Sequence, residues 1–372
     1  MFEAMIWTVT GGVLLLGYAA LLLWLRGGLQ RLGKPTLPAM PTVSVIVSLH
    51  NEAGNLPALM RCLNAQDYPA DRLTILLVND RSTDNTAAMI DEYAGTHAQI
   101  DAIHIKETPT AHSPKKHAIA TAIDHAEGNI IVTTDGDGLP GPQWIRTLVA
   151  KFSPEVDVVL GYAPYRSDGI FNTLFHRLLA LEYFSLGAVA AAAVGRDFPL
   201  TSNGVNFAYR RSLFQSVNGF GETLTELSGD DDLLLHRFLT LTDAKVAFAA
   251  DSMAAVPNAP PANLKRFIRQ RIRFSSKHAA YPARVMPVLF LVYFTHLWTV
   301  ISLIAALFLP SLWPQTALIL FFKMACEILL LTQAQQLLES RSLLKYYPLA
   351  ALPHLFYVVF IPVLAQLLPK RW

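Results

Sequence analysis

Two carboxylates one residue apart, Asp135 and Asp137, follow an apolar run at residues 130–134. An apolar strand that ends at Asp-x-Asp delivers hard oxygen ligands to the carboxyl edge of a parallel sheet, where open α/β sheets bind their ligands. This spacing therefore indicates a place for a divalent cation and a diphosphate. The same residues also suit a plain Asp/Gly turn that closes a strand, so the rest of the chain has to decide between the two.

Polar residues follow two further apolar runs. Residues 43–49 lead into Asn51 and Glu52, and residues 73–78 lead into Asp80. Carboxylates on neighbouring strand ends repel one another unless a cation or hydrogen-bond donors lie among them, and a nucleotide with its metal supplies both. Thr83 suits the cap of the next helix, and Asp80, which precedes that cap, is the better ligand candidate.

Short β-branched runs alternate with helical stretches between Pro41 and about Asp251. This alternation predicts an α/β fold with parallel strands and crossover helices. We expect strands at residues 43–49, 73–78, 102–105, 130–134, 157–161 and 246–250, with helices at about 53–65, 84–97, 115–127 and 142–152.

The composition indicates a chain in two parts. Of its 372 residues 52% are hydrophobic and 16% charged, and a mean hydropathy of +0.34 lies between that of a soluble enzyme and that of a membrane bundle. The net charge of +2 and the lack of a long basic run elsewhere argue against nucleic acid as a partner. The two cysteines, Cys62 and Cys326, fall in different parts, so we expect neither a disulfide nor a cysteine metal site.

Long apolar stretches predict four membrane spans, at residues 4–25, 286–309, 312–334 and 346–368. Arg26, Arg31 and Lys34 follow the first stretch, which reads as a retained anchor that leaves the next residues in the cytoplasm. Four spans would put Lys370 and Arg371 outside, against the same rule. Residues 178–195 are also apolar, but Glu182 interrupts them and a crossing there would separate Asp135 from Asp230, so we expect a buried or interfacial helix.

The motifs together resemble those of family 2 glycosyltransferases, inverting enzymes with a GT-A nucleotide-sugar-binding domain. The similar segments, in chain order, are residues 43–52, 77–86 (with Arg81 where Gly is usual), 113–118, 134–137, 201–211, 228–232 and 270–274. The resemblance implies a GT-A fold with a Rossmann-like mixed sheet. It divides the chain into an anchor and linker (residues 1–40), a cytoplasmic catalytic domain (41–260), an amphipathic interfacial helix (261–285) and about three C-terminal transmembrane helices (286–372).

The resemblance also assigns roles to residues. Asp137 is the first choice for a Mg²⁺ or Mn²⁺ ligand, with Asp135 beside it on the metal or ribose, and Asp231 falls at the position of the base, with Asp230 as its acidic neighbour. One of the acids at 230–232 also suits the cap of the helix that follows. The donor-binding candidates are Asn51, Glu52, Asp80, Lys115, Lys116, Asp135, Gln270 and Arg273, and those on the acceptor side are Asn203, Gly204 and Phe274. A solvated helix start explains Lys115 or Lys116 equally well, so both stay open.

These roles predict an inverting transferase that moves a sugar from a nucleotide-diphospho-sugar, expected to be a UDP-sugar, to a membrane lipid at a bacterial inner membrane. Residues 262–284 hold seven Lys or Arg and no Asp or Glu, which indicates a helix lying on anionic headgroups. A processive polysaccharide synthase is the alternative enzyme, made less favourable by Phe274 in place of the Trp that stacks on the acceptor sugar in polymerising relatives. The non-enzyme alternative is a membrane scaffold or sugar-lipid carrier, which would be expected to lack a metal or base carboxylate.

Overall fold

The structure is a computed structural model that describes residues 2–33, 40–277, 280–340 and 342–368. It divides into two compact units, an α/β unit of residues 32–166 and 197–260 and a helical unit of residues 1–31, 167–196 and 261–371. Residues 167–196, which the sequence prediction includes in the catalytic domain, group with the helical unit. Lys34, Lys370 and Arg371 lie outside the described residues.

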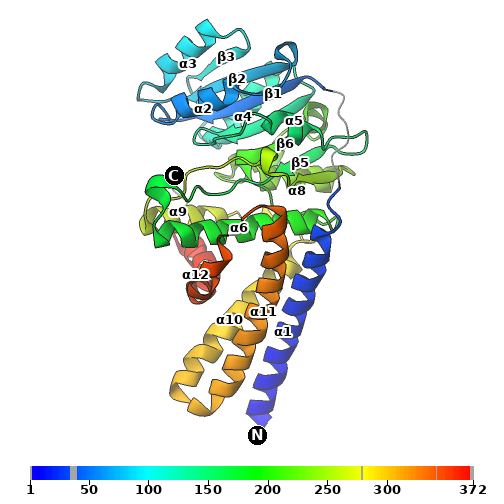
Figure 1. The fold of residues 1–372 in the computed structure, drawn as a ribbon, viewed down its shortest axis with the longest axis vertical. Coiled ribbons are helices and arrows are strands. Elements are labelled where there is room, and N and C mark those ends of the chain that lie inside the picture. The colour runs from blue at the N-terminus through cyan, green and yellow to red at the C-terminus, as the bar shows by residue number, and fades with distance from the viewer. Residues whose placement is uncertain (1, 34–39, 278–279, 341, 369–372) are drawn as a thin grey trace. The chain divides into compact units, whose positions relative to one another are not determined.

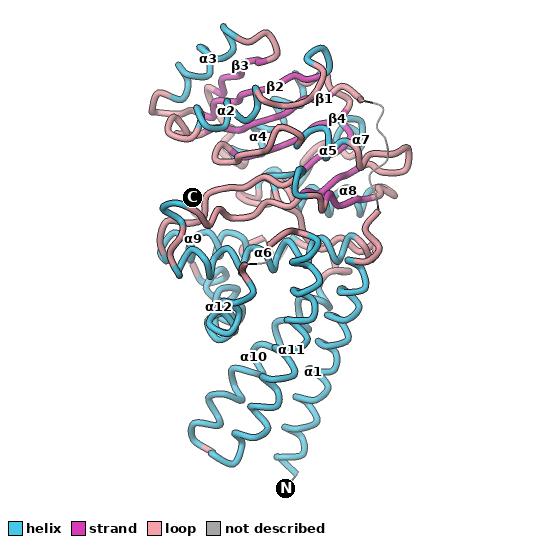
Figure 2. Tube along the Cα trace, viewed as in Figure 1, coloured by secondary structure: helices cyan, strands magenta, loops and turns pink. Residues whose placement is uncertain are grey.

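A mixed sheet forms the centre of the α/β unit (Figure 2). In the described chain its strands are β1 (Val43–Leu49), β2 (Leu73–Asp80), β3 (Ile100–Ile105), β4 (Ile130–Asp135), β5 (Val158–Gly161), β6 (Phe207–Arg210) and β7 (Val246–Ala249). They lie in the order β3-β2-β1-β4-β6-β5-β7. β6 is antiparallel to both of its neighbours, and the other pairs are parallel.

Each of the six strands expected from the sequence is present, and β6 was not anticipated. β1 and β2 are buried on both faces because helices cover the sheet on each side, which explains their continuous apolar runs. These helices are α2 (Leu56–Asn64), α3 (Thr86–Thr96), α4 (Pro114–His125) and α5 (Trp144–Val149), and the unit also contains α7 (Arg211–Ser216) and α8 (Asp232–Leu241) (Figure 1). A hydrophobic core cluster lies between β1, β2, β4 and helices α2, α3 and α5.

The helical unit consists of α1 (Phe2–Leu29), α6 (Leu174–Val194), α9 (Leu264–Ser275), α10 (Met286–Phe308), α11 (Trp313–Leu337) and α12 (Tyr347–Leu367). All of these except α9 belong to stretches long and apolar enough to cross a membrane. The share of the most apolar window that is buried in the protein is 61% for α6 but 22–28% for the others. Burial of α6 against the rest of the protein explains its apolar sequence, and contact with lipid is not needed to explain it.

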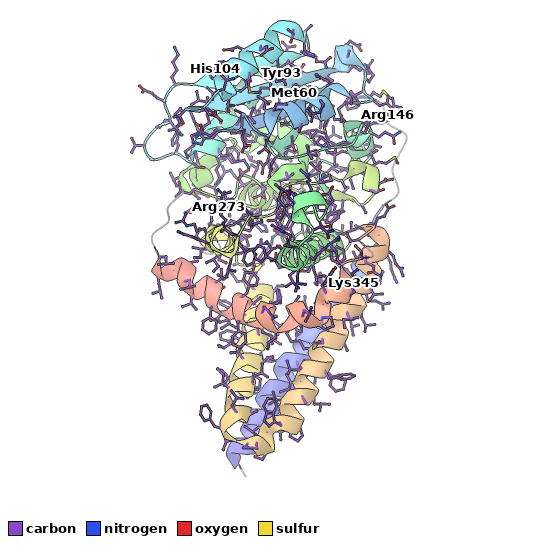
Figure 3. All side chains as sticks on the ribbon, turned by 60° about the vertical axis from the view of Figure 1, so that its left-hand side comes forward. Met60, Tyr93, His104, Arg146, Arg273 and Lys345 are labelled. Atoms are coloured by element: carbon purple, nitrogen blue, oxygen red, sulfur yellow. The ribbon has the colours of Figure 1, made fainter. Side chains whose placement is uncertain are left out.

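Helices α1, α10 and α11 pack alongside one another, whereas α12 runs across them (Figure 3). Glu327 of α11 connects α12 to the other helices. Its carboxylate accepts a hydrogen bond from Tyr18 of α1 at 2.6 Å and others from Lys323 and from Tyr347 of α12. A carboxylate among apolar helices is costly unless donors satisfy it. This cluster therefore fixes α12 to α1 and α11.

The direction of α12 generates a prediction for membrane topology. Because α12 runs across the other helices, we expect it to lie along the membrane interface, and the C-terminus then stays on the side where α1 and α11 end. Green fluorescent protein and alkaline phosphatase fused after residue 372 should report the same side as fusions after residue 339 and the opposite side to fusions after residue 309. If the C-terminal fusions instead match those after residue 309, α12 is the fourth span predicted from the sequence.

Candidate active site

The loops that follow β1, β2 and β4 lie at one edge of the sheet. The strand register pairs Ser48 with Asp135 and Leu49 with Asn79, so the carboxyl ends of the three strands are level. The Asn51 side-chain oxygen accepts hydrogen bonds from the backbone N–H groups of Thr83, at 2.7 Å, and Asp84, at 3.3 Å. Asn51 therefore ties the first two loops together, and its predicted contact with the donor remains a prediction.

Asp80 lies at the end of β2 with 5% of its surface exposed. The Arg81 guanidinium donates to its carboxylate at 2.8 Å. Arg81 has a φ of +55°, in the left-handed region that favours glycine, which explains why the family usually has Gly at this position. Arginine at this position places a positive charge directly beside Asp80, which is predicted to bind the nucleotide. The ion pair between Arg81 and Asp80 was not predicted from the sequence.

Glu52, Asp135 and Asp137 form an acidic group at this edge. Burial raises the pKa of Asp137 to about 6, with further contributions from the charges of Asp135 and Glu52. Burial also raises the pKa of Glu52. Gly136 allows this approach, because a Cβ there would lie 2.9 Å from Glu52 Cγ. The group is therefore short of positive charge.

The donor set of this group fits a divalent cation. Among the described residues no three His, Cys, Asp or Glu side chains form a complete metal site. Mg²⁺ and Mn²⁺ at phosphate sites commonly use one or two carboxylates and take their remaining ligands from the substrate phosphates and water. Asp137 and Asp135 satisfy that requirement.

Lys115, at the start of α4, joins two acidic segments. Its Nζ lies 2.7 Å from Asp135 Oδ1 and 2.8 Å from Asp230 Oδ2. Burial alone would lower the pKa of Lys115, but the charges of Asp135 and Asp230 hold it above its ordinary value. The predicted metal segment and the predicted base segment are thus neighbours across one ammonium group.

Lys116 has a different environment. Its side chain is fully buried and donates to the main-chain oxygen of Thr223 at 2.6 Å. Burial lowers the pKa of Lys116 to about 8. Of the two lysines that the sequence left open, Lys115 pairs with Asp135 and Asp230 and Lys116 donates to a main-chain oxygen, and which of them contacts the diphosphate remains a prediction.

Asp231 is held by backbone donors on both carboxylate oxygens. It is the N-cap of α8 and accepts from the Asp232 N–H at 2.7 Å, and its other oxygen accepts from the Gly204 N–H at 2.8 Å. The cap expected among the three acids is therefore the same residue that the motif assigns as base. A Cβ on Gly204 would lie 2.9 Å from Asp230 Oδ2, so only glycine permits this approach.

Asn206 supports the same region and was missed from the sequence. It is fully buried, accepts from Trp144 Nε1 at 3.0 Å and donates to the main-chain oxygens of Tyr162 and Ala254. Asn203 accepts from the Val205 N–H at 3.1 Å and so shapes the turn that presents Gly204. The feature of the sequence that could have identified Asn206 is its place as a polar residue directly before an apolar run.

The remaining predicted site residues lie on α9 in the helical unit. Cationic groups surround the Phe274 ring: its centroid is 5.2 Å from the Arg271 guanidinium carbon, 5.5 Å from that of Arg273 and 5.4 Å from Lys277 Nζ. The donor contacts expected of Gln270 and Arg273 and the acceptor contact expected of Phe274 remain predictions.

Comparison with known proteins agrees with the fold and the motifs. The family model described as Glycosyl transferase family 2 matches residues 44–217. A probable glycosyltransferase, YdaM of Bacillus subtilis, is 26% identical over 190 residues, which are 51% of this chain and 45% of that protein. An undecaprenyl-phosphate 4-deoxy-4-formamido-L-arabinose transferase of Klebsiella pneumoniae is 33% identical over 148 residues, 39% of this chain and 43% of that protein. The chain thus spans less than half the length of these two relatives.

Among solved structures, the mannosyltransferase PcManGT from Pyrobaculum calidifontis, in complex with GDP-Man and Mn²⁺, matches with a TM-score of 0.62 at 21% identity, and the match covers 100% of both chains. At this identity the likeness shows the fold, which confirms the predicted GT-A architecture.

The raised pKa of Asp137 generates a prediction for the metal-free protein. With a folded pKa of about 6 against 3.8 for an ordinary aspartate, the folded state binds more protons between pH 4 and 6. Stability therefore falls as the pH rises through that window, by at most about 3 kcal/mol. Asp137→Asn should raise the thermal midpoint above pH 6, with a gain that shrinks toward pH 4.

Metal supplies the second measurement for the same variant. Adding Mn²⁺ with a nucleoside diphosphate should raise the midpoint of the wild-type protein and leave Asp137→Asn nearly unchanged, because ligand binding stabilises only a folded state that holds the site. Equal metal-dependent stabilisation of both proteins would remove Asp137 from the metal site.

Proposed function

We propose that this chain, whose residues 44–217 match the family 2 glycosyltransferases, transfers a sugar from a nucleotide-diphospho-sugar to a lipid acceptor in the membrane. The observation that carries the proposal is the bridge from Lys115 to Asp135 and Asp230, which unites the metal motif and the base motif in one site. The apolar helices of the other unit support a lipid acceptor.

On the donor side the chain provides a cation-binding group and an ammonium. Asp137 and Asp135 would hold Mg²⁺ or Mn²⁺, which when bound supplies positive charge against the diphosphate leaving group. Lys115 balances the charges of Asp135 and Asp230 and would contact the diphosphate. Asp80, with Arg81 beside it, and Glu52 would bind the base and ribose.

On the acceptor side Asp231 is the base. Each of its oxygens accepts one backbone N–H bond, and a carboxylate oxygen has a second lone pair with which to take a proton from an acceptor hydroxyl. The two backbone bonds hold the carboxylate without help from mobile side chains. Attack by the acceptor on the face opposite the diphosphate inverts the anomeric centre, so we expect inversion.

Two classes of lipid acceptor make different demands on Asp231. A lipid hydroxyl must lose a proton as it attacks, whereas a lipid phosphate, the acceptor named for the Klebsiella relative, is already ionised near neutral pH. Only the first acceptor needs a general base. The two classes can therefore be separated by substitution of a single residue.

The central experiment incubates purified full-length protein with radiolabelled UDP-, GDP- or dTDP-sugars, Mn²⁺ or Mg²⁺ and a total lipid extract. We expect the label in one discrete lipid, with the inverted anomeric configuration by NMR, and no product from Asp137→Asn. A ladder of products would indicate a polymerising enzyme. An absence of transfer from every donor would contradict the proposal.

Asp231→Asn tests the acceptor class. With a hydroxyl acceptor, loss of the base should lower kcat by roughly 10²–10⁴-fold, because proton transfer contributes on that scale. With a lipid phosphate the same variant should keep kcat within about tenfold of wild type, since no proton has to move. Parallel assays with a polyprenol phosphate and a diacylglycerol measure kcat for the two acceptor classes. An equal fall in kcat on both lipids would show that Asp231 acts by some means other than proton removal.

Gly204→Ala tests the packing of the acceptor-side turn against Asp230. The added methyl would lie 2.9 Å from Asp230 Oδ2 and must displace that carboxylate, so we expect kcat to fall at least about tenfold, with a small change in thermal midpoint. Gly141→Ala is the matched control, because a Cβ there meets nothing within 4 Å. Similar activity in the two variants would show that Asp230 tolerates displacement.

A further inference from the structure

Helix α9 combines residues with predicted roles and one residue with an unusual environment. Gln270, Arg273 and Phe274 carry the predicted roles toward donor and acceptor, while Arg271 lies among them with only 1% of its surface exposed. Arginine is rarely buried to this degree unless it is paired. Its surroundings therefore indicate what holds α9 in place.

The Arg271 guanidinium is enclosed by one carboxylate and three aromatic rings. It forms an ion pair with Glu182 of α6. Its central carbon lies 5.6 Å from the ring centroid of Tyr183, 5.1 Å from that of Phe267 and 5.2 Å from that of Phe274. A planar guanidinium suits such a site, because it binds a carboxylate through its edge and stacks on rings through its faces.

Helix α12 closes the same site from a third direction. Tyr357 hydrogen-bonds to Glu182, and its ring centroid lies 5.9 Å from that of Phe267. Thus α6, α9 and α12 meet at a single ion pair. The exposed Arg269, two residues before Arg271 on the same helix, is outside this contact.

We propose that Glu182 and Arg271 are positioning residues that set the rotation of α9 and thereby the orientation of Gln270, Arg273 and Phe274. Successive residues of an α-helix are about 100° apart, so fixing Arg271 fixes the directions of the residues that flank it. The contribution to sugar transfer rests on the proposed function, whereas the contribution to the order of α9 does not.

Stability alone is a weak reason for such a pair. Buried ion pairs often add little stability compared with apolar residues of similar volume, and their best attested use is to specify one arrangement over others. Around the guanidinium, Phe267 and Phe274 come from α9 itself and turn with Arg271, whereas Glu182 and Tyr183 come from α6. A rotation of α9 would therefore break the ion pair and the Tyr183 contact together. This coupling makes the pair a device for orientation.

Arg271→Lys and Arg269→Lys form a matched pair for the test, because they make the same chemical change on the same helix and both keep the charge. Lysine at 271 loses the planar fork and the stacking. With Arg271→Lys we expect hydrogen exchange over residues 264–275 at least about fivefold faster than in wild type, and kcat reduced at least about tenfold with the donor KM within about twofold. Arg269→Lys should match wild type in each measurement, and Glu182→Gln should reproduce the effects of Arg271→Lys.

The measurements separate the possible failures. A purely structural pair would lower the thermal midpoint and the yield of folded protein while kcat per folded molecule stayed at the wild-type value, and that result overturns the proposal. Unchanged exchange over residues 264–275 in both Arg271→Lys and Glu182→Gln also overturns it. If wild-type protein transfers no sugar, the proposed function fails, and the exchange comparison still decides whether the pair orders α9.

Discussion

The candidate site depends on the two ion pairs that the Lys115 ammonium group forms with Asp135 and Asp230. Carboxylates from separate strand ends and from the start of α8 repel one another when brought together, so a positive charge among them is a condition for their meeting. Lys115 supplies that charge at a fixed place. It leaves Asp137 uncompensated, and the raised pKa of Asp137 marks the position where a second positive charge belongs.

The reversed strand β6 gives the site its second side. The parallel strands β1, β2 and β4 can deliver residues only to one edge, where the donor candidates lie. β6 pairs antiparallel with β4, so the turn before it, with Asn203 and Gly204, approaches the same edge from the opposite chain direction. At Gly204 there is no room for a side chain beside Asp230, and its backbone N–H donates to Asp231. One reversal in an otherwise parallel sheet brings acceptor-side residues to the donor-side edge.

Much of this arrangement could be predicted from the sequence, and the exceptions have physical causes. The strands with apolar runs could be recognised from the sequence, whereas β6 follows the buried Asn206, whose partners come from distant segments. Sequence could not separate Lys115 from Lys116, because neighbours on a helix point in directions about 100° apart and only the fold shows which direction faces the acids. Nor could it show that Asp231 is both cap and candidate base, since the two uses employ different lone pairs of one carboxylate.

Buried charged groups also determine how elements are held together in the helical unit. Apolar side chains gain little by leaving lipid for one another, so packing among apolar helices specifies their mutual directions weakly. Polar groups do so strongly because each must find its partner. Glu327 joins α12 to α1 and α11, and Glu182 with Arg271 joins α9 to α6 and α12. Buried charge thus ties α12 to α1 and α11 and ties α9 to α6 and α12, and on our proposal it gives α9, with its predicted contacts to donor and acceptor, one orientation among apolar helices.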